Sequence, residues 1–210
     1  MISHHPSPET LLAHAAGTLV AGHTVVVAAH VQGCAHCQAA LTRMEALGGA
    51  LMEDLAPEPL AAEAFAQVLA RLDEPAPKPP PPPRQINLAL PSGLRLPVAL
   101  RGAQIGRWLR IGRGLRYSRV RLPWAPEQNV MLLKVAGGRK VLHHSHGGME
   151  LTQVLWGGFH DETGQYGPGD IGEADETTEH QPIADPEGCV CLASLEGGLR
   201  LPWFTRLLGW

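Results

Sequence analysis

The sequence predicts a multidomain α + β fold, in which an N-terminal domain of four helices is joined through a proline-rich linker to a C-terminal all-β barrel. Seven of the 19 prolines gather within residues 75–83. Apolar residues recur at helical spacing before this stretch, and short apolar runs separated by glycine clusters follow it. These observations place the predicted domains at residues 1–73 and 87–210, with the linker at residues 74–86.

The N-terminal segment contains patterns for four helices. Ser7 and Pro8 form an N-cap and first-turn pair for a helix that stops at Gly17. A second helix is expected over residues 22–31, and a third from about residue 35. The third helix carries one apolar stripe, consisting of Leu41, Met44, Leu47 and Leu51. The fourth is marked by apolar residues at i, i+3, i+4 and i+7, namely Phe65, Val68, Leu69 and Leu72.

The helical segment is acidic. Residues 1–73 contain two arginines and seven acidic side chains, for a net charge of −5. Because phosphate binding requires Lys and Arg, this balance excludes nucleic acid as the direct partner of the segment. A basic protein surface is the more natural complement.

Prolines dominate the linker. Each proline ring fixes φ and removes an N–H donor, so this stretch can join neither a helix ladder nor a sheet interior. We expect a semi-rigid polyproline II spacer. A ligand for an SH3-type domain is the alternative, which a chain without eukaryotic regulatory features does not favour.

Residues 87–210 contain short apolar runs, such as 130–135 and 151–156, between Gly and Pro clusters. This pattern predicts a β-sandwich or barrel. Residues 87–140 carry eleven basic groups and one acid, whereas residues 141–210 carry two basic groups and eleven acids. Cross-strand pairing of these charges is the preferred explanation, and a functional basic patch is the alternative.

The overall composition is that of a globular protein, with 44% hydrophobic and 18% charged residues and a net charge of −3. No apolar run approaches the roughly 20 residues that a membrane helix needs. The N-terminus has neither the basic start nor the apolar core of a secretory signal. We therefore expect neither a membrane span nor secretion.

His30, Cys34 and Cys37 form the pattern H-x3-C-x2-C at the expected junction of the second and third helices. A structural zinc site needs four ligands, and His4 or His5 is available as the fourth. A redox dithiol is the alternative, but the βαβ pattern of a thioredoxin-like motif is missing. The other histidines of this half are expected at the surface: His14, His23 and His36.

His144 and His146 alternate along a predicted strand, so both imidazoles lie on one face. Glu150 follows after three residues, and His180 lies beyond a glycine-rich turn. Three imidazoles and one carboxylate that point into a barrel would form a mononuclear metal site. These ligands suit zinc and leave manganese, iron or nickel as alternatives.

The two clusters carry a family resemblance. Residues 1–72 resemble the zinc-binding anti-sigma domain, a four-helix module with an upstream His followed by H-x3-C-x2-C. The spacing from Gly138 through the second cluster to Gly157 resembles the first cupin motif, and the turn at residues 167–170 followed by His180 resembles the second. In this order, the parts are similar to the ChrR family of anti-sigma factors over nearly the whole chain.

The resemblance implies both sites and roles. It implies structural zinc on His5, His30, Cys34 and Cys37, with His5 favoured over His4 by its distance from His30. It also implies a cytoplasmic protein whose helical domain holds an extracytoplasmic-function sigma factor. The cupin would release this sigma factor in response to singlet oxygen or organic peroxides. We expect the bound surface to include the apolar stripe of the fourth helix.

Cys189 and Cys191 form C-x-C on a late predicted strand, where alternation aims both thiols at one face. Packing as small apolar residues is the simpler explanation. A redox-active pair is the alternative, consistent with oxidant sensing.

A second functional class remains open. A cupin with three His and one Glu could be a metalloenzyme of the dioxygenase or isomerase type, with the helical domain as an accessory. No acid–base residue beyond the metal ligands can be assigned to such an active site, so the sequence predicts no catalytic residue.

Overall fold

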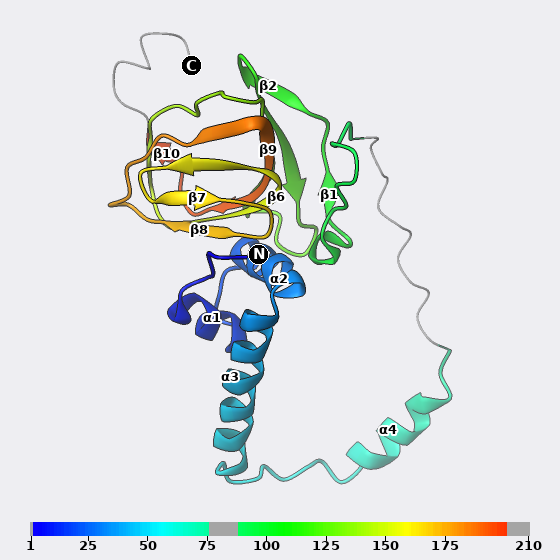
Figure 1. Cartoon of the computed structure of the whole chain (residues 1–210). Coiled ribbons are helices and arrows are strands. Elements are labelled where there is room, and N and C mark those ends of the chain that lie inside the picture. Colours follow the sequence, from blue (N-terminus) through cyan, green and yellow to red (C-terminus); the bar gives the residue numbers. More distant parts are fainter. Residues whose placement is uncertain (1, 76–87, 201–210) are drawn as a thin grey trace.

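The computed structural model describes residues 2–75 and 88–200, and it shows four helices followed by a curled antiparallel sheet (Figure 1). The predicted fold class is confirmed. Most of the proline-rich linker, residues 76–87, lies outside the described residues. Among the described helices, none has the length and apolar character that crossing a membrane requires.

The observed helices agree closely with those predicted from the sequence. They are α1 (Pro8–Ala15), α2 (Ala21–Gly33), α3 (Ala35–Glu53) and α4 (Ala64–Leu72). Ser7 caps α1 as predicted, because its side chain accepts a hydrogen bond from the amide of Thr10. Cys34 separates α2 from α3 and caps α3, since its sulfur accepts a hydrogen bond from the amide of Cys37.

Helix α4 packs on nothing within the described chain. None of its residues is buried. Figure 1 shows it on an extended segment away from the sheet and from α1 to α3. The stripe predicted for α3 is also exposed toward its C-terminal end, where Leu47 is 60% and Leu51 62% exposed.

The main sheet has the strand order β1-β3-β4-β9-β6-β7, with β2 paired to β3 and β8 paired to β6. Its strands are β1 (Gln104–Ile105), β2 (Leu109–Gly112), β3 (Leu115–Arg121), β4 (Asn129–Val135), β6 (Glu150–Asp161), β7 (Gly164–Tyr166), β8 (Ile171–Ala174) and β9 (Ile183–Leu195). Two short strands, β5 (Ser145–His146) and β10 (Leu199–Arg200), pair separately. A one-turn 3-10 helix, Val98–Leu100, precedes β1.

The long strand β6 is interrupted by two register shifts against β9. Gly157 lies at the second shift with φ +67°, and a Cβ there would lie 1.9 Å from the carbonyl oxygen of Gly188. Only glycine fits this close approach of two backbones. The irregularity changes which side chains of β6 face the inside of the curled sheet.

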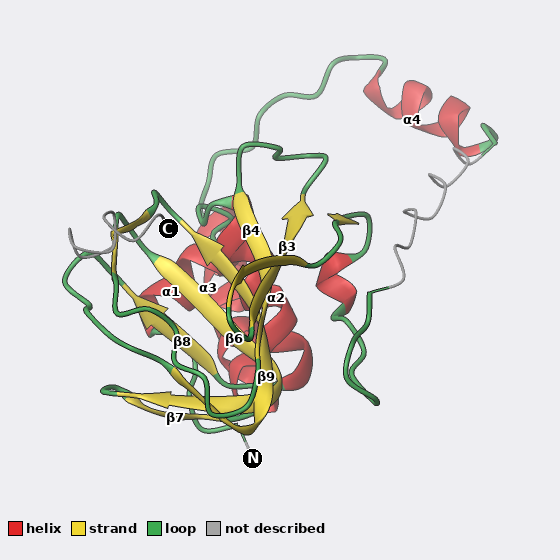
Figure 2. Ribbon diagram, turned by 90° about the horizontal axis from the view of Figure 1, so that it is seen from above, coloured by secondary structure: helices red, strands yellow, loops and turns green. Residues whose placement is uncertain are grey.

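One buried cluster includes side chains from both predicted domains. Val26 and Val27 of α2 are fully buried in the same cluster as Leu132 of β4 and Leu192 of β9. Helix α2 lies against the sheet at β6 and β9 (Figures 1 and 2). The helical part and the sheet therefore share apolar burial, although the predicted boundaries at residues 73 and 87 stay predictions.

Two expectations were wrong. His23, predicted at the surface, has an exposed fraction of 0%, because it lies on the side of α2 that faces β9, where its Nδ1 is 2.9 Å from Ser194 Oγ. His14 is half-buried, whereas His36 is exposed as predicted.

Cross-strand charge pairing is also not found, because no ion pair within residues 88–200 involves an arginine or lysine. The arginines of β2 and β3 are exposed instead.

Candidate metal centres

The first candidate centre lies where α2, α3 and the N-terminal segment meet. His5, His30, Cys34 and Cys37 each offer one ligand atom, and these atoms all lie within 4.8 Å of one another. His5 Nδ1 is 3.4 Å from Cys34 Sγ and 3.5 Å from Cys37 Sγ. Two imidazoles and two thiols around one point satisfy the ligand number and type of a closed tetrahedral zinc site.

Local structure explains how these side chains converge. His30 lies in the last turn of α2, Cys34 at the helix junction and Cys37 in the first turn of α3. His5 reaches the group from the segment before α1. Its neighbour His4 points elsewhere, since its ring packs on Tyr166 with a centroid distance of 4.3 Å.

His30 is oriented for a ligand role. Its Nδ1 is 2.8 Å from the carbonyl oxygen of Gly169, so this nitrogen carries the proton and donates it. The opposite nitrogen, Nε2, is buried without a hydrogen-bond partner among the described residues. A buried ring nitrogen with a free lone pair that faces two thiols fits a metal ion.

Without a bound cation, the surroundings of the first centre favour the uncharged forms of its imidazole and thiol side chains. Burial lowers the pKa of His30, which keeps its ring neutral. Burial and the neighbouring Cys34 thiol raise the pKa of Cys37 to about 12. A bound zinc ion would reverse this preference for the thiols, because a coordinating thiol is deprotonated by the metal.

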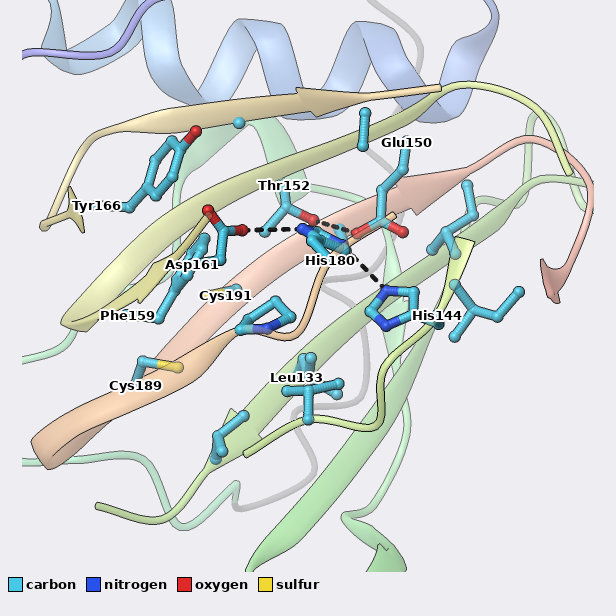
Figure 3. A pocket seen from close by; sticks show the side chains of 18 of the residues that line it. Leu133, His144, Glu150, Thr152, Phe159, Asp161, Tyr166, His180, Cys189 and Cys191 are labelled. Carbon is cyan, nitrogen blue, oxygen red and sulfur yellow. Dashed lines mark hydrogen bonds and ion pairs between the residues drawn. The ribbon is translucent and has the colours of Figure 1, made fainter. Parts of the chain in front are cut away.

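The second candidate centre lies inside the curled sheet. His144, His146 and His180 bring their ligand atoms within 4.8 Å of one another. His144 and His180 face each other across an antiparallel bridge, with 3.2 Å between their Nε2 atoms. Glu150, the fourth expected ligand, lies beside the group, with its Oε2 3.2 Å from His146 Nε2. Figure 3 shows Glu150, His180 and His144 converging.

Hydrogen bonds on the far side orient two of these imidazoles. His180 Nδ1 is 2.8 Å from Asp161 Oδ2, and His144 Nδ1 is 2.6 Å from the carbonyl oxygen of Leu142. Both rings therefore present Nε2 to the centre, as metal-binding imidazoles do. Alternation along the strand could not identify Asp161, because the register shifts in β6 break the alternation that would relate it to Glu150.

Burial and ion pairing set the charges of the second centre. Burial lowers the pKa of His144. Hydrogen bonding to Glu150 raises the pKa of His146. Burial opposes ionisation of Glu150, yet hydrogen bonding and charge from His146 bring the pKa of its carboxyl below the ordinary value. Without a cation, Glu150 is thus held ionised beside a His146 ring that favours its proton, and a divalent cation bound there would displace this proton.

A cavity of about 380 Å³ adjoins the second centre. His144, His180 and Glu150 line it together with mostly apolar side chains, which include Leu133, Phe159, Tyr166, Cys189 and Cys191 (Figure 3). This lining suits a small, mostly apolar molecule next to the imidazoles.

The two cysteines of β9 line this cavity, as their alternation predicts. Both are buried and free. A hydrogen bond with Cys191 lowers the pKa of Cys189, whereas hydrogen bonding to Cys189 and burial raise the pKa of Cys191 well above its ordinary value. The ionisation of one thiol therefore depends on the other, because the two are hydrogen-bonded and buried together.

Comparison with known proteins agrees with this arrangement. Residues 101–197 match the family model of the ChrR cupin-like domain. The chain is 40% identical over 208 residues to the anti-sigma-E factor ChrR of Cereibacter sphaeroides, covering 99% of this chain and 96% of that protein.

A solved structure is also similar, the crystal structure of Rhodobacter sphaeroides SigE in complex with the anti-sigma ChrR. The matched chain is 38% identical, with a TM-score of 0.75, and the match covers 93% of this chain and 100% of that chain. Because the identity extends along nearly the whole of both chains, the protein belongs to the ChrR family of anti-sigma factors.

Proposed function

We propose that the protein binds an extracytoplasmic-function sigma factor through its helical part and releases it when the cupin part senses singlet oxygen or an organic peroxide. The observation that supports a sigma factor as the partner is the full-length similarity to ChrR, which is crystallised with SigE. Because sigma factors act on RNA polymerase, this function places the protein in the cytoplasm. The parts would be an anti-sigma domain at residues 1–73, a linker at residues 74–86 and a cupin sensor at residues 87–210.

Helix α4 supplies the most obvious binding surface. Its apolar side chains are exposed by 47% to 74%, namely Phe65, Val68, Leu69 and Leu72. An amphipathic helix with an unpartnered apolar face fits a groove on a second protein. The acidic charge of residues 1–73 favours a basic surface around that groove.

The first centre would hold zinc through His5, His30, Cys34 and Cys37. Zinc bound there would join the N-terminal segment to α2 and α3, and so stabilise the sigma-binding conformation. Its role would be structural, because four protein ligands leave no open position for chemistry.

The second centre and its cavity would detect the oxidant. His144, His146, Glu150 and His180 would hold zinc, with manganese, iron or nickel as alternatives. The apolar cavity gives an uncharged peroxide access to these residues and to Cys189 and Cys191. A peroxide would oxidise one of these thiols to a sulfenic acid and leave as the corresponding alcohol.

The cavity also supports a second candidate function. A mostly apolar pocket of about 380 Å³ beside three imidazoles and a carboxylate has the size and lining of a small-molecule site. A cupin metalloenzyme of the dioxygenase or isomerase type, with the zinc domain as an accessory, would use it for substrate. Turnover of a small molecule by iron-, manganese- or nickel-loaded protein would favour this alternative.

Co-purification of the full chain with candidate sigma factors, combined with metal analysis, tests the proposal. Replacing Cys34 and Cys37 with Ser should remove one metal equivalent and abolish sigma binding. Replacing His144 and His146 with Ala should remove the other equivalent, leave sigma binding intact and block release by peroxide. The anti-sigma role fails if the cysteine variant still holds the sigma factor tightly, and the sensor role fails if the histidine variant still releases it.

A further inference from the structure

The turn at residues 167–170, between β7 and β8, is the place where the cupin touches the first candidate metal centre. It contacts both the N-terminal segment that carries His5 and the ring of His30. The N-terminal segment also contacts β8 directly, because the amide of Ile171 donates to the carbonyl oxygen of His4 at 3.3 Å. The turn therefore connects two strands of the sheet and, at the same time, contacts residues of the first candidate metal centre.

Gly169 fixes the orientation of His30. Its carbonyl oxygen accepts the hydrogen bond from Nδ1 of His30 at 2.8 Å, which directs the opposite nitrogen toward the two thiols. This contact joins residues 139 positions apart in the chain. The helical part thus supplies the His30 ring, and the cupin supplies the carbonyl group that orients this ring.

Asp170 fixes the backbone that leads to His5. Its Oδ1 accepts hydrogen bonds from the amides of Ser3, at 2.6 Å, and His4, at 3.0 Å. Its Oδ2 accepts a hydrogen bond from the amide of Gly167 at 2.8 Å, which closes the turn itself. The side chain is only 3% exposed, so water cannot replace these bonds easily.

The sheet holds the turn in place. The amide of Gly169 donates to the carbonyl oxygen of Val154 in β6 at 2.8 Å, and the amide of Val154 donates to the carbonyl oxygen of Asp170 at 2.9 Å. Gly169 has φ +94°, and a Cβ there would lie 2.7 Å from Ile2 Cγ1. The turn and the N-terminal segment are thus in close contact as well as hydrogen-bonded.

We propose that this cupin turn is a positioning element for the metal centre of the helical part, with Gly169 aiming His30 and Asp170 holding the segment before His5. The inference rests on the proposed function insofar as the first centre binds metal. It adds that two of the four ligands are positioned by the sensor part. A displacement of the turn would therefore weaken the zinc site without any change in its ligands.

The full-length protein loaded with cobalt(II) provides the test. A thiolate-to-cobalt charge-transfer band reports only the first centre, because the second has no cysteine ligand. Asp170→Asn should shift this band and speed metal loss to the chelator 4-(2-pyridylazo)resorcinol by about 10-fold to 100-fold. Asp175→Asn is the matched control, since Asp175 closes an exposed turn of the same sheet through Thr177 and Thr178, and it should exchange as wild type does.

A milder variant guards against misfolding of Asp170→Asn. Ser3 is exposed, and its hydroxyl lies 3.3 Å and 3.4 Å from the two carboxylate oxygens of Asp170. Ser3→Ala should speed metal loss by about threefold, as expected for one hydrogen bond. Wild-type exchange in both Ser3→Ala and a folded Asp170→Asn would overturn the positioning role alone. A wild-type protein without the charge-transfer band would instead contradict the metal centre of the proposed function.

Discussion

His23 is a single side chain whose burial links the helices to the sheet. It is 0% exposed, lies 2.9 Å from Ser194 Oγ, and its Nε2 is 3.6 Å from Glu196 Oε1. Burial lowers the pKa of His23 below 6.5 despite the nearby carboxylates. Below pH 6.5 the unfolded chain therefore binds a proton that the folded chain resists, so acid lowers the free energy of unfolding.

His23→Gln removes this titration while it retains a polar group for Ser194. Between pH 7 and pH 5.5, the variant should lose less unfolding free energy than wild type, by at most about 1 kcal/mol per pH unit. Urea denaturation of the full chain at several pH values measures the two slopes. Equal slopes for wild type and His23→Gln would show that His23 titrates alike in both states.

At the scale of the element, α4 differs from the other helices because none of its side chains is buried against the rest of the described chain. No residue of α4 is buried, so Phe65→Ala combined with Leu72→Ala should change the unfolding free energy by less than about 0.5 kcal/mol. The same change should weaken sigma binding at least about tenfold if these side chains are anchors of the interface. Thermal unfolding and a binding titration separate the two effects.

Leu60→Ala provides the matched control for α4. Leu60 is 84% exposed and lies just before the helix, outside its apolar stripe. This variant should bind the sigma factor as wild type does. If it weakens binding as much as the α4 double variant, the apolar stripe is not the specific contact surface.

Elements defined by local spacing could be predicted from the sequence, and contacts between distant elements could not. The cap of α1, the junction at Cys34 and the stripe of α4 depend on neighbours within a few residues, where helix geometry determines the spacing. The burial of His23 and the role of Asp161 depend on how α2 lies on β9 and on the shifts in β6. No periodicity in the chain encodes these tertiary arrangements.

In the whole molecule, a contiguous series of contacts joins the two candidate metal centres. His180 is bonded to Asp161, which accepts a hydrogen bond from the Thr163 hydroxyl, and this hydroxyl lies 2.9 Å from the hydroxyl of Tyr166. The Tyr166 ring packs on His4, which precedes His5 of the first centre. A change at His180 thus has a direct physical route to the segment that carries His5.

Conservative variants can break this series without removing a ligand. Thr163→Val and Tyr166→Phe each delete one hydroxyl and keep the shape of the side chain. Sigma binding without oxidant should stay within about twofold of wild type, whereas release by an organic peroxide should slow about fivefold or more, the lower end of typical coupling between two sites. Release is measured as the rate at which the sigma factor dissociates from immobilised full-length protein.

Thr177→Val is the control for both variants. The Thr177 hydroxyl donates to the Asp175 carboxylate in an exposed turn outside the series from His180 through Tyr166 to His4, so its loss should leave release unchanged. If Thr163→Val and Tyr166→Phe release the sigma factor at the Thr177→Val rate, these hydroxyls do not transmit the signal. The remaining physical connection would then be the shared apolar core of α2 with β6 and β9, in which a signal would have to move the helix as a body rather than one ligand.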